Sequence, residues 1–266
     1  MFVFGATVDR MRWTVLLAAL LLAAVAARAE GEKGGPVGKA DVAGVMINTE
    51  AQAIKAIESQ LRGTGPWSDK EDQTSADGLG RALGAAGPWL PVFARTLAVH
   101  VEDENVEQRT LAVFVLDRVA KEVGAAPILK ALERSPALFD GVKPVGHPTN
   151  HPDLRWSLLM ALGTAAEPKD TAAIALLRKA AHEERGFWLL GALGRVDTAW
   201  LLANARTVVP KKALGGALRA MPDTAGRLAM IRALAPWTAE EKQAALAAPF
   251  WGLLSDASQV RKALER

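Results

Sequence analysis

A short phrase recurs along this chain, each time at the end of an apolar segment. Four copies end in Leu-Gly and one in Leu-Asp: Arg81–Gly84, Phe114–Asp117, Met160–Gly163, Gly191–Gly194 and Lys212–Gly215. Two pairs of neighbouring copies lie about 31 to 33 residues apart, and a period of roughly 20 to 50 residues is the signature of proteins built from stacked units. The sequence therefore predicts similar units in series.

Each phrase is followed by a turn and a second apolar segment, so one unit is predicted to be two antiparallel helices. In the clearest unit, residues 153–181, Leu154, Leu158 and Leu162 fall on a single helical stripe. Gly163 follows that stripe and is placed to end the helix as a left-handed C-cap. Such a pair cannot bury both of its apolar faces alone, so neighbouring pairs are expected to stack and share one core.

Helix starts are marked by residues that favour the N-cap position. Asn105, Asp170 and Asp197 each stand just before an apolar helical segment. Thr49 and Gln52 have the spacing of a capping box at the start of the helix predicted over Thr49–Leu61. That helix and the C-terminal helices are expected to cap the two ends of the repeat array.

Composition favours the same fold class. Half of the residues are hydrophobic, alanine and leucine dominate, and no stretch alternates β-branched and polar residues as a strand would. We therefore predict an all-α protein, an α-α superhelix of about five antiparallel helix pairs.

The N-terminal residues resemble a secretory signal peptide. Arg10 and Arg12 precede the apolar stretch Trp13–Ala26, which is shorter than the roughly 20 apolar residues of a membrane span. The small residues Ala27–Ala29 then suit signal peptidase. We predict a signal peptide over 1–29, a Gly-rich linker over 30–40 and the helical domain over 41–266, with a loop insertion at 135–152. An uncleaved signal anchor is the alternative, and Met11 is an alternative start.

The phrase "HPDLRWSLLMALG" (His151–Gly163), and likewise "NVEQRTLAVFVLD" (Asn105–Asp117), resembles the first helix of a HEAT or HEAT-like (PBS-lyase-type) repeat. The resemblance covers roughly 80–206 and, more weakly, 211–234. It implies a curved α-solenoid that serves as a protein-binding scaffold. Some repeats of this type occur in phycobilin lyases, but nothing in this chain favours that chemistry.

Basic residues recur toward the ends of the predicted second helices. They are Arg95, Lys130, Arg134, Arg178, Lys179, Arg206 and Lys211. In a HEAT-like solenoid the second helices line the concave face, so these residues are predicted to form a ridge that binds an acidic surface of another protein. The alternative is that each cation only complements its own helix dipole, which is worth about 0.3 to 1 kcal/mol.

A second candidate site lies in the loop before Leu154. His147, His151 and Asp153 are close enough in sequence for an extended loop to hold a zinc ion with three ligands. Pro148 and Pro152 follow the two histidines and argue against one continuous helix. The alternative is a polar loop that leads into a helix, with His151 near its N-cap.

Aromatic residues follow proline at Trp67, Trp89, Trp237 and Phe250-Trp251. Such residues either anchor the first turn of a helix in the core or form exposed platforms for a peptide or a sugar. The first interpretation is favoured.

The remaining motifs argue against an enzyme. The chain has no cysteine, no G-x-S-x-G sequence and no phosphate-binding Gly-rich loop, and its small net charge of +3 gives no reason to expect nucleic-acid binding. We predict an exported, non-enzymatic scaffold that binds another protein, needs no cofactor and contacts a membrane only through the signal segment. A metal-dependent hydrolase built around 147–153 and an envelope structural protein without a specific ligand are the alternatives.

Overall fold

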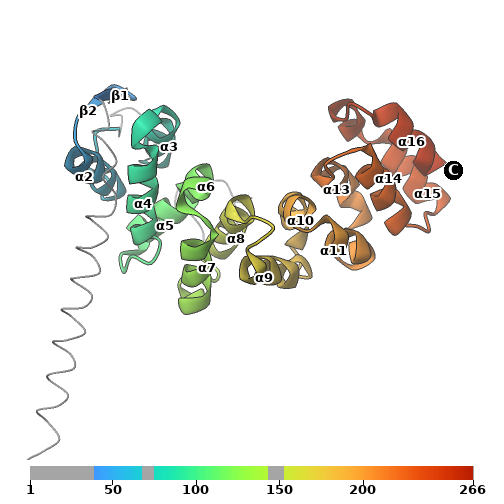
Figure 1. Ribbon diagram of the computed structural model, residues 1–266. Coiled ribbons are helices and arrows are strands. Elements are labelled where there is room, and N and C mark those ends of the chain that lie inside the picture. The colour runs from blue at the N-terminus through green and yellow to red at the C-terminus, as the bar shows by residue number, and fades with distance from the viewer. Residues whose placement is uncertain (1–38, 68–74, 143–152, 266) are drawn as a thin grey trace, which may run out of the picture. The chain divides into compact units, whose positions relative to one another are not determined.

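The computed structural model describes residues 39–67, 75–142 and 153–265, and this part of the chain is mostly helical (Figure 1). The α-helices are α2 (Glu50–Leu61), α3 (Ser75–Ala85), α4 (Leu90–His100), α5 (Val106–Val115), α6 (Ala120–Val123), α7 (Ala125–Arg134), α8 (Leu154–Ala165), α9 (Thr171–Ala181), α10 (Leu190–Val196), α11 (Thr198–Ala203), α12 (Ala205–Val208), α13 (Leu214–Ala220), α14 (Thr224–Ala233), α15 (Ala239–Ala247) and α16 (Ala257–Glu265). The 3₁₀ helices are η1 (Gly87–Trp89), η2 (Leu116–Val119), η3 (Pro136–Leu138), η4 (Gly186–Leu189), η5 (Lys211–Ala213) and η6 (Pro249–Leu253). The predicted signal segment and nearly all of the predicted linker lie outside the described residues.

A small antiparallel hairpin precedes the helices, where no strand was predicted. Strand β1 (Ala40–Val42) pairs with β2 (Val45–Ile47) across a two-residue turn in which Ala43 and Gly44 both have positive φ. Val42 and Ile47 are fully buried. The strands are only three residues long, too short for the alternation of apolar and polar residues to stand out in the sequence.

Side-chain caps begin the helices at most of the predicted positions. The side chains of Thr49, Asn105 and Asp197 accept hydrogen bonds from backbone N–H groups in the first turns of α2, α5 and α11. Asp170 precedes α9, but its carboxylate accepts from the backbone N–H of Glu167 instead. The N-cap of α8 is Asp153 and not His151.

The glycines of the recurring phrase do not end helices, contrary to the sequence-based expectation. Gly163 lies inside α8, Gly194 lies inside α10, and neither has a positive φ. A β-carbon at Gly163 would lie 2.6 Å from the Ala192 side chain of α10, and one at Gly194 would lie 2.3 Å from the carbonyl oxygen of Ala220 in α13. These glycines therefore allow neighbouring helices to approach closely.

The core follows the predicted leucine stripe. Leu154, Leu158 and Leu162 are fully buried, and α8 packs against α5, α7 and α10, while α10 packs in turn against α13. Burial of each such leucine contributes roughly 1.5 to 3 kcal/mol.

The tryptophans that follow proline mostly anchor the core, as favoured from the sequence. Trp67, Trp89 and Trp251 are each no more than 5% exposed, whereas Trp237 is half-buried. None of the helices in the described ranges is long and apolar enough to cross a membrane.

Candidate functional site

An open groove of about 970 Å³ runs between α10 and α13. We call it the α10–α13 groove. Its described lining residues are Phe187, Trp188, Leu190, Gly191, Gly194, Arg195, Thr198, Ala213, Gly216, Arg219, Ala220, Met221, Pro222 and Arg227. A volume of this size falls in the range of roughly 300 to 1,000 Å³ that is usual for ligand sites.

Small residues create the space in this groove. The close contact of Gly194 with the Ala220 backbone brings α10 and α13 together at one point. A β-carbon built on Gly191 or Gly216, by contrast, would meet no atom within 4 Å. Both helices thus turn bare backbone toward the groove, where a larger side chain would partly fill it.

Aromatic rings form one wall. Phe187 and Trp188 of η4 are both half-buried, and their ring centroids lie 5.8 Å apart in an edge-to-face arrangement. Trp188 also meets the buried Trp156 edge to face at 6.0 Å, and the guanidinium of Arg185 lies 5.6 Å from its ring centroid. These contacts on several sides hold Trp188 in place.

Two of the three arginines in the groove are held by the backbone of helix ends. Arg195 of α10 donates to the carbonyl oxygens of Gly163, Thr164 and Ala166 at the C-terminal end of α8. These are carbonyls that a helix end leaves without intrahelical partners. Arg195 therefore caps the preceding helix.

Arg227 of α14 plays a similar part for α13. Its Nε donates to the carbonyl oxygen of Leu218 at 3.2 Å, and its Nη1 pairs with a carboxylate oxygen of Asp256 at 2.8 Å. Hydrogen bonds from the Thr224 hydroxyl and from Arg227 hold the pKa of Asp256 below its usual value. The charge of Arg227 is therefore compensated within the chain.

Arg219 differs from the other two arginines. Its side chain is exposed, and its Nε donates to the carbonyl oxygen of Gly215 in the same helix at 3.3 Å. Within the described ranges no carboxylate pairs with Arg219. Its terminal guanidinium nitrogens can thus reach an anionic group of a ligand.

A second groove of about 500 Å³ lies on the other side of α10, next to α8. It shares Trp188, Gly191 and Arg195 with the α10–α13 groove and adds Asp117 and Lys121, one charge of each sign. The helix α10 therefore separates two adjoining grooves, and the excess of positive charge is on the α13 side.

The seven basic residues predicted as a ridge do not line the α10–α13 groove. Five of them contact other parts of the chain: Arg95 pairs with Glu50 at 3.1 Å, Arg134 with Glu102 at 3.4 Å, Arg178 with Asp197, and Lys211 with Glu241 at 2.6 Å, while Arg206 donates to the carbonyl oxygen of Ala233 at 3.2 Å. Lys130 and Lys179 are exposed, and in the described part of the chain they make no ion pair. Most of this predicted binding set thus joins elements far apart in sequence, and its role toward a partner remains a prediction.

Two of these pairs also involve a tryptophan. Arg178 lies 5.7 Å from the centroid of Trp200, next to its partner Asp197, which is the N-cap of α11. Lys211 lies 5.0 Å from the centroid of Trp237. A cation held by a carboxylate and an aromatic ring is well fixed, and it is less available to a third group.

Of the three predicted metal ligands, only Asp153 lies in the described residues. One of its oxygens accepts the backbone N–H of Trp156 at 3.0 Å, and the other contacts Arg185 at 3.4 Å. His147 and His151 fall in the undescribed segment 143–152. Elsewhere in the described ranges no cluster of three or more potential ligands is found.

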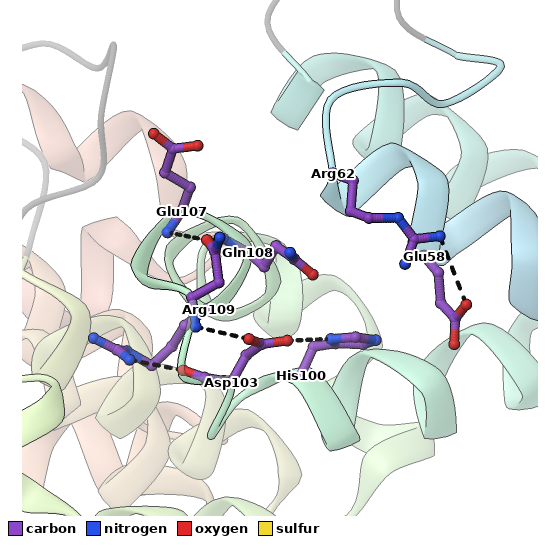
Figure 2. Close-up of polar contacts among 8 residues, drawn as sticks. Glu58, Arg62, His100, Asp103, Glu107, Gln108 and Arg109 are labelled. Atoms are coloured by element: carbon purple, nitrogen blue, oxygen red, sulfur yellow. Dashed lines mark hydrogen bonds and ion pairs between the residues drawn. The ribbon is translucent and has the colours of Figure 1, made fainter.

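A polar cluster fixes the turn between α4 and α5 (Figure 2). His100 Nδ1 lies 2.7 Å from Asp103 Oδ2, and the backbone N–H of Asn105 donates to Asp103 Oδ1 at 2.8 Å. The buried Arg109 donates to the carbonyl oxygen of Asp103 at 2.7 Å. Partial burial raises the pKa of Asp103, but the hydrogen bonds from His100 and Asn105 outweigh it, so the net pKa is lowered.

A histidine oriented by a carboxylate is also an arrangement found in general bases. The small groove beside His100 has a volume of about 240 Å³, and the hydroxyl that lines it, that of Thr96, donates to the carbonyl oxygen of Val92 in its own helix. We therefore assign the cluster to the structure of the turn. Its carboxylates were interpreted in this way from the sequence, with Asn105 as the cap.

The groove residues were not predicted from the sequence. Glycines were interpreted there as helix ends, so Gly191 and Gly194, spaced three apart within one helix, were not seen as a groove surface. Arg195 and Arg219 follow directly in the same helical segments. Paired glycines inside an otherwise regular helical segment, followed by arginine, were the signal available.

Comparison with known proteins adds no relative: no family model, no curated protein and no solved structure matches this chain.

Proposed function

We propose that this protein is an exported, non-enzymatic scaffold whose stacked helix pairs form a HEAT-like solenoid and bind another protein. The observation that carries the proposal is the α10–α13 groove, which is open, partly aromatic and positively charged at Arg219. The serial packing of α8, α10 and α13 supports the repeat arrangement.

The groove suits a binding role better than a catalytic one. Two of its arginines are committed to carbonyl groups of helix ends, and the remaining polar side chains on its wall are Arg219 and Thr198. Thr198 donates to the carbonyl oxygen of Gly194 in the preceding turn. General acid–base or nucleophilic chemistry needs a group that can take up or give a proton near neutral pH, and the groove offers none among its described residues.

Two surfaces are candidates for the partner. One is the α10–α13 groove, and the other is the predicted ridge, whose exposed members without ion pairs in the described chain are Lys130 and Lys179. Photo-crosslinking separates them: benzoylphenylalanine is placed at Gly216, at Lys130 or at Lys179 of the full chain in the cells that make it. Arg62, exposed on α2, is the control position.

A discrete crosslinked protein from Gly216 or from the lysine positions, and none from Arg62, is the expected result. If every position gives only uncrosslinked chain, the scaffold proposal is wrong. Export is tested separately by N-terminal sequencing of the mature protein, which is expected to begin at Glu30. A full-length chain in the membrane fraction would instead support the signal anchor.

A further inference from the structure

We propose that the α10–α13 groove binds an extended acidic segment of another protein, with a carboxylate of that segment on Arg219 and a neighbouring apolar side chain against Phe187 and Trp188. This inference rests on the proposed scaffold function and specifies the occupant of its groove.

Charge is the first argument. The described residues that line the groove include three arginines and no aspartate or glutamate. Asp256 compensates Arg227, and the carbonyl ends of α8 hold Arg195, so Arg219 carries the charge that lacks a partner in the described chain. An arginine presents a planar set of donors that matches a carboxylate in a bidentate manner.

Shape is the second argument. The groove has a volume of about 970 Å³, far more than a single phosphate or carboxylate ion needs, and it is bordered by the bare backbone of Gly191 and Gly216. Such surfaces allow the main chain of a peptide to approach closely. The half-buried rings of Phe187 and Trp188 offer apolar contact area within the same groove.

The rest of the molecule argues for a protein segment over nucleic acid. Binding to nucleic acid rests on many phosphate contacts made by a basic surface. The chain as a whole has a net charge of only +3 over 266 residues, and five of the seven basic residues of the predicted ridge are engaged within the chain. One uncompensated arginine beside aromatic rings fits a peptide with alternating acidic and apolar residues.

The test measures fluorescence anisotropy of labelled nine-residue peptides on the full chain. One peptide alternates glutamate with leucine and phenylalanine, a second has glutamine in place of glutamate, and a third has lysine. The acidic peptide is expected to bind at least about tenfold more tightly than the glutamine peptide, and the difference should shrink as salt is raised, because exposed charges are screened. The lysine peptide is expected not to bind.

Variants then locate the site. Arg219→Glu should weaken binding of the acidic peptide at least about tenfold by charge reversal. Gly216→Leu should weaken it similarly, because the new side chain enters open space in the groove. Two matched controls should leave binding unchanged: Gly84→Leu, at a helical glycine of α3 that also has open space, and Arg232→Glu, an exposed arginine of α14 that is not part of the groove lining.

A benzoylphenylalanine in place of the peptide's phenylalanine should crosslink within η4 or α10. The inference is overturned if the glutamine peptide binds equally well, if no peptide binds, or if binding survives both Arg219→Glu and Gly216→Leu. If Gly216 fails in the cellular crosslinking experiment while Lys130 or Lys179 captures a protein, the scaffold proposal stands and this inference falls. If none of these positions captures a protein, both fall.

Discussion

Gly194 of α10 faces the backbone of α13 so closely that a β-carbon on it would lie 2.3 Å from the carbonyl oxygen of Ala220. Real β-carbons are not found that close to a backbone oxygen, so any side chain there must push the two helices apart. The contact sets the distance between the two helices that border the α10–α13 groove.

Gly194→Ala is therefore expected to destabilise the protein by about 1 to 3 kcal/mol, as overpacking usually does. Urea denaturation of the full chain measures the change. Gly191→Ala is the control in the same helix: its β-carbon meets open space, and alanine favours helix over glycine by roughly 1 kcal/mol. Equal effects of the two substitutions would contradict the role given to the Gly194 contact.

Arg195→Ala is expected to cost about 1.5 to 3 kcal/mol, because hydrogen bonds from a charged donor to three carbonyl groups at the end of α8 are lost. Arg219→Ala, on the next helix and exposed, should change stability by no more than about 0.5 kcal/mol. Thermal unfolding compares the two. If both arginines matter equally for stability, Arg219 is a structural residue and not one reserved for a ligand.

Asp197→Ala is expected to destabilise more than Arg178→Ala. Asp197 caps α11 by accepting the backbone N–H of Trp200, and it also pairs with Arg178. Loss of an N-cap costs about 1 kcal/mol, whereas a half-exposed ion pair contributes little. A double-mutant cycle in urea isolates the pair, and a coupling energy above the cost of the cap would reverse this order.

Stability is expected to fall in acid partly through Asp103. Its folded-state pKa is lowered below the ordinary 3.8, so the native state favours the charged form. The contribution of Asp103 is complete above that value and is lost as pH falls through the lower folded pKa. The difference in unfolding free energy between the wild-type protein and Asp103→Asn should be constant above about pH 5 and shrink below pH 4. A difference that grows in acid would contradict the lowered pKa.

The helical class, the leucine stripe of α8 and the caps at Thr49, Asn105 and Asp197 could be predicted because they depend on local spacing. The role of Gly163 could not, since a glycine that ends a helix and one that admits a neighbouring helix look alike until the neighbour is known. The groove was missed for the same reason. It arises between helices, and no periodicity within one helix reports the distance to the next.

The contacts of Arg195 have a further consequence for how the chain is completed during synthesis. Its partner carbonyl at Gly163 was made 32 residues earlier, so the last turn of α8 waits for a later part of the chain. A nascent chain that stops short of Arg195 leaves that turn frayed, even when every residue of α8 is present. Each helix end settled in this way ties the maturation of one unit to the arrival of the next.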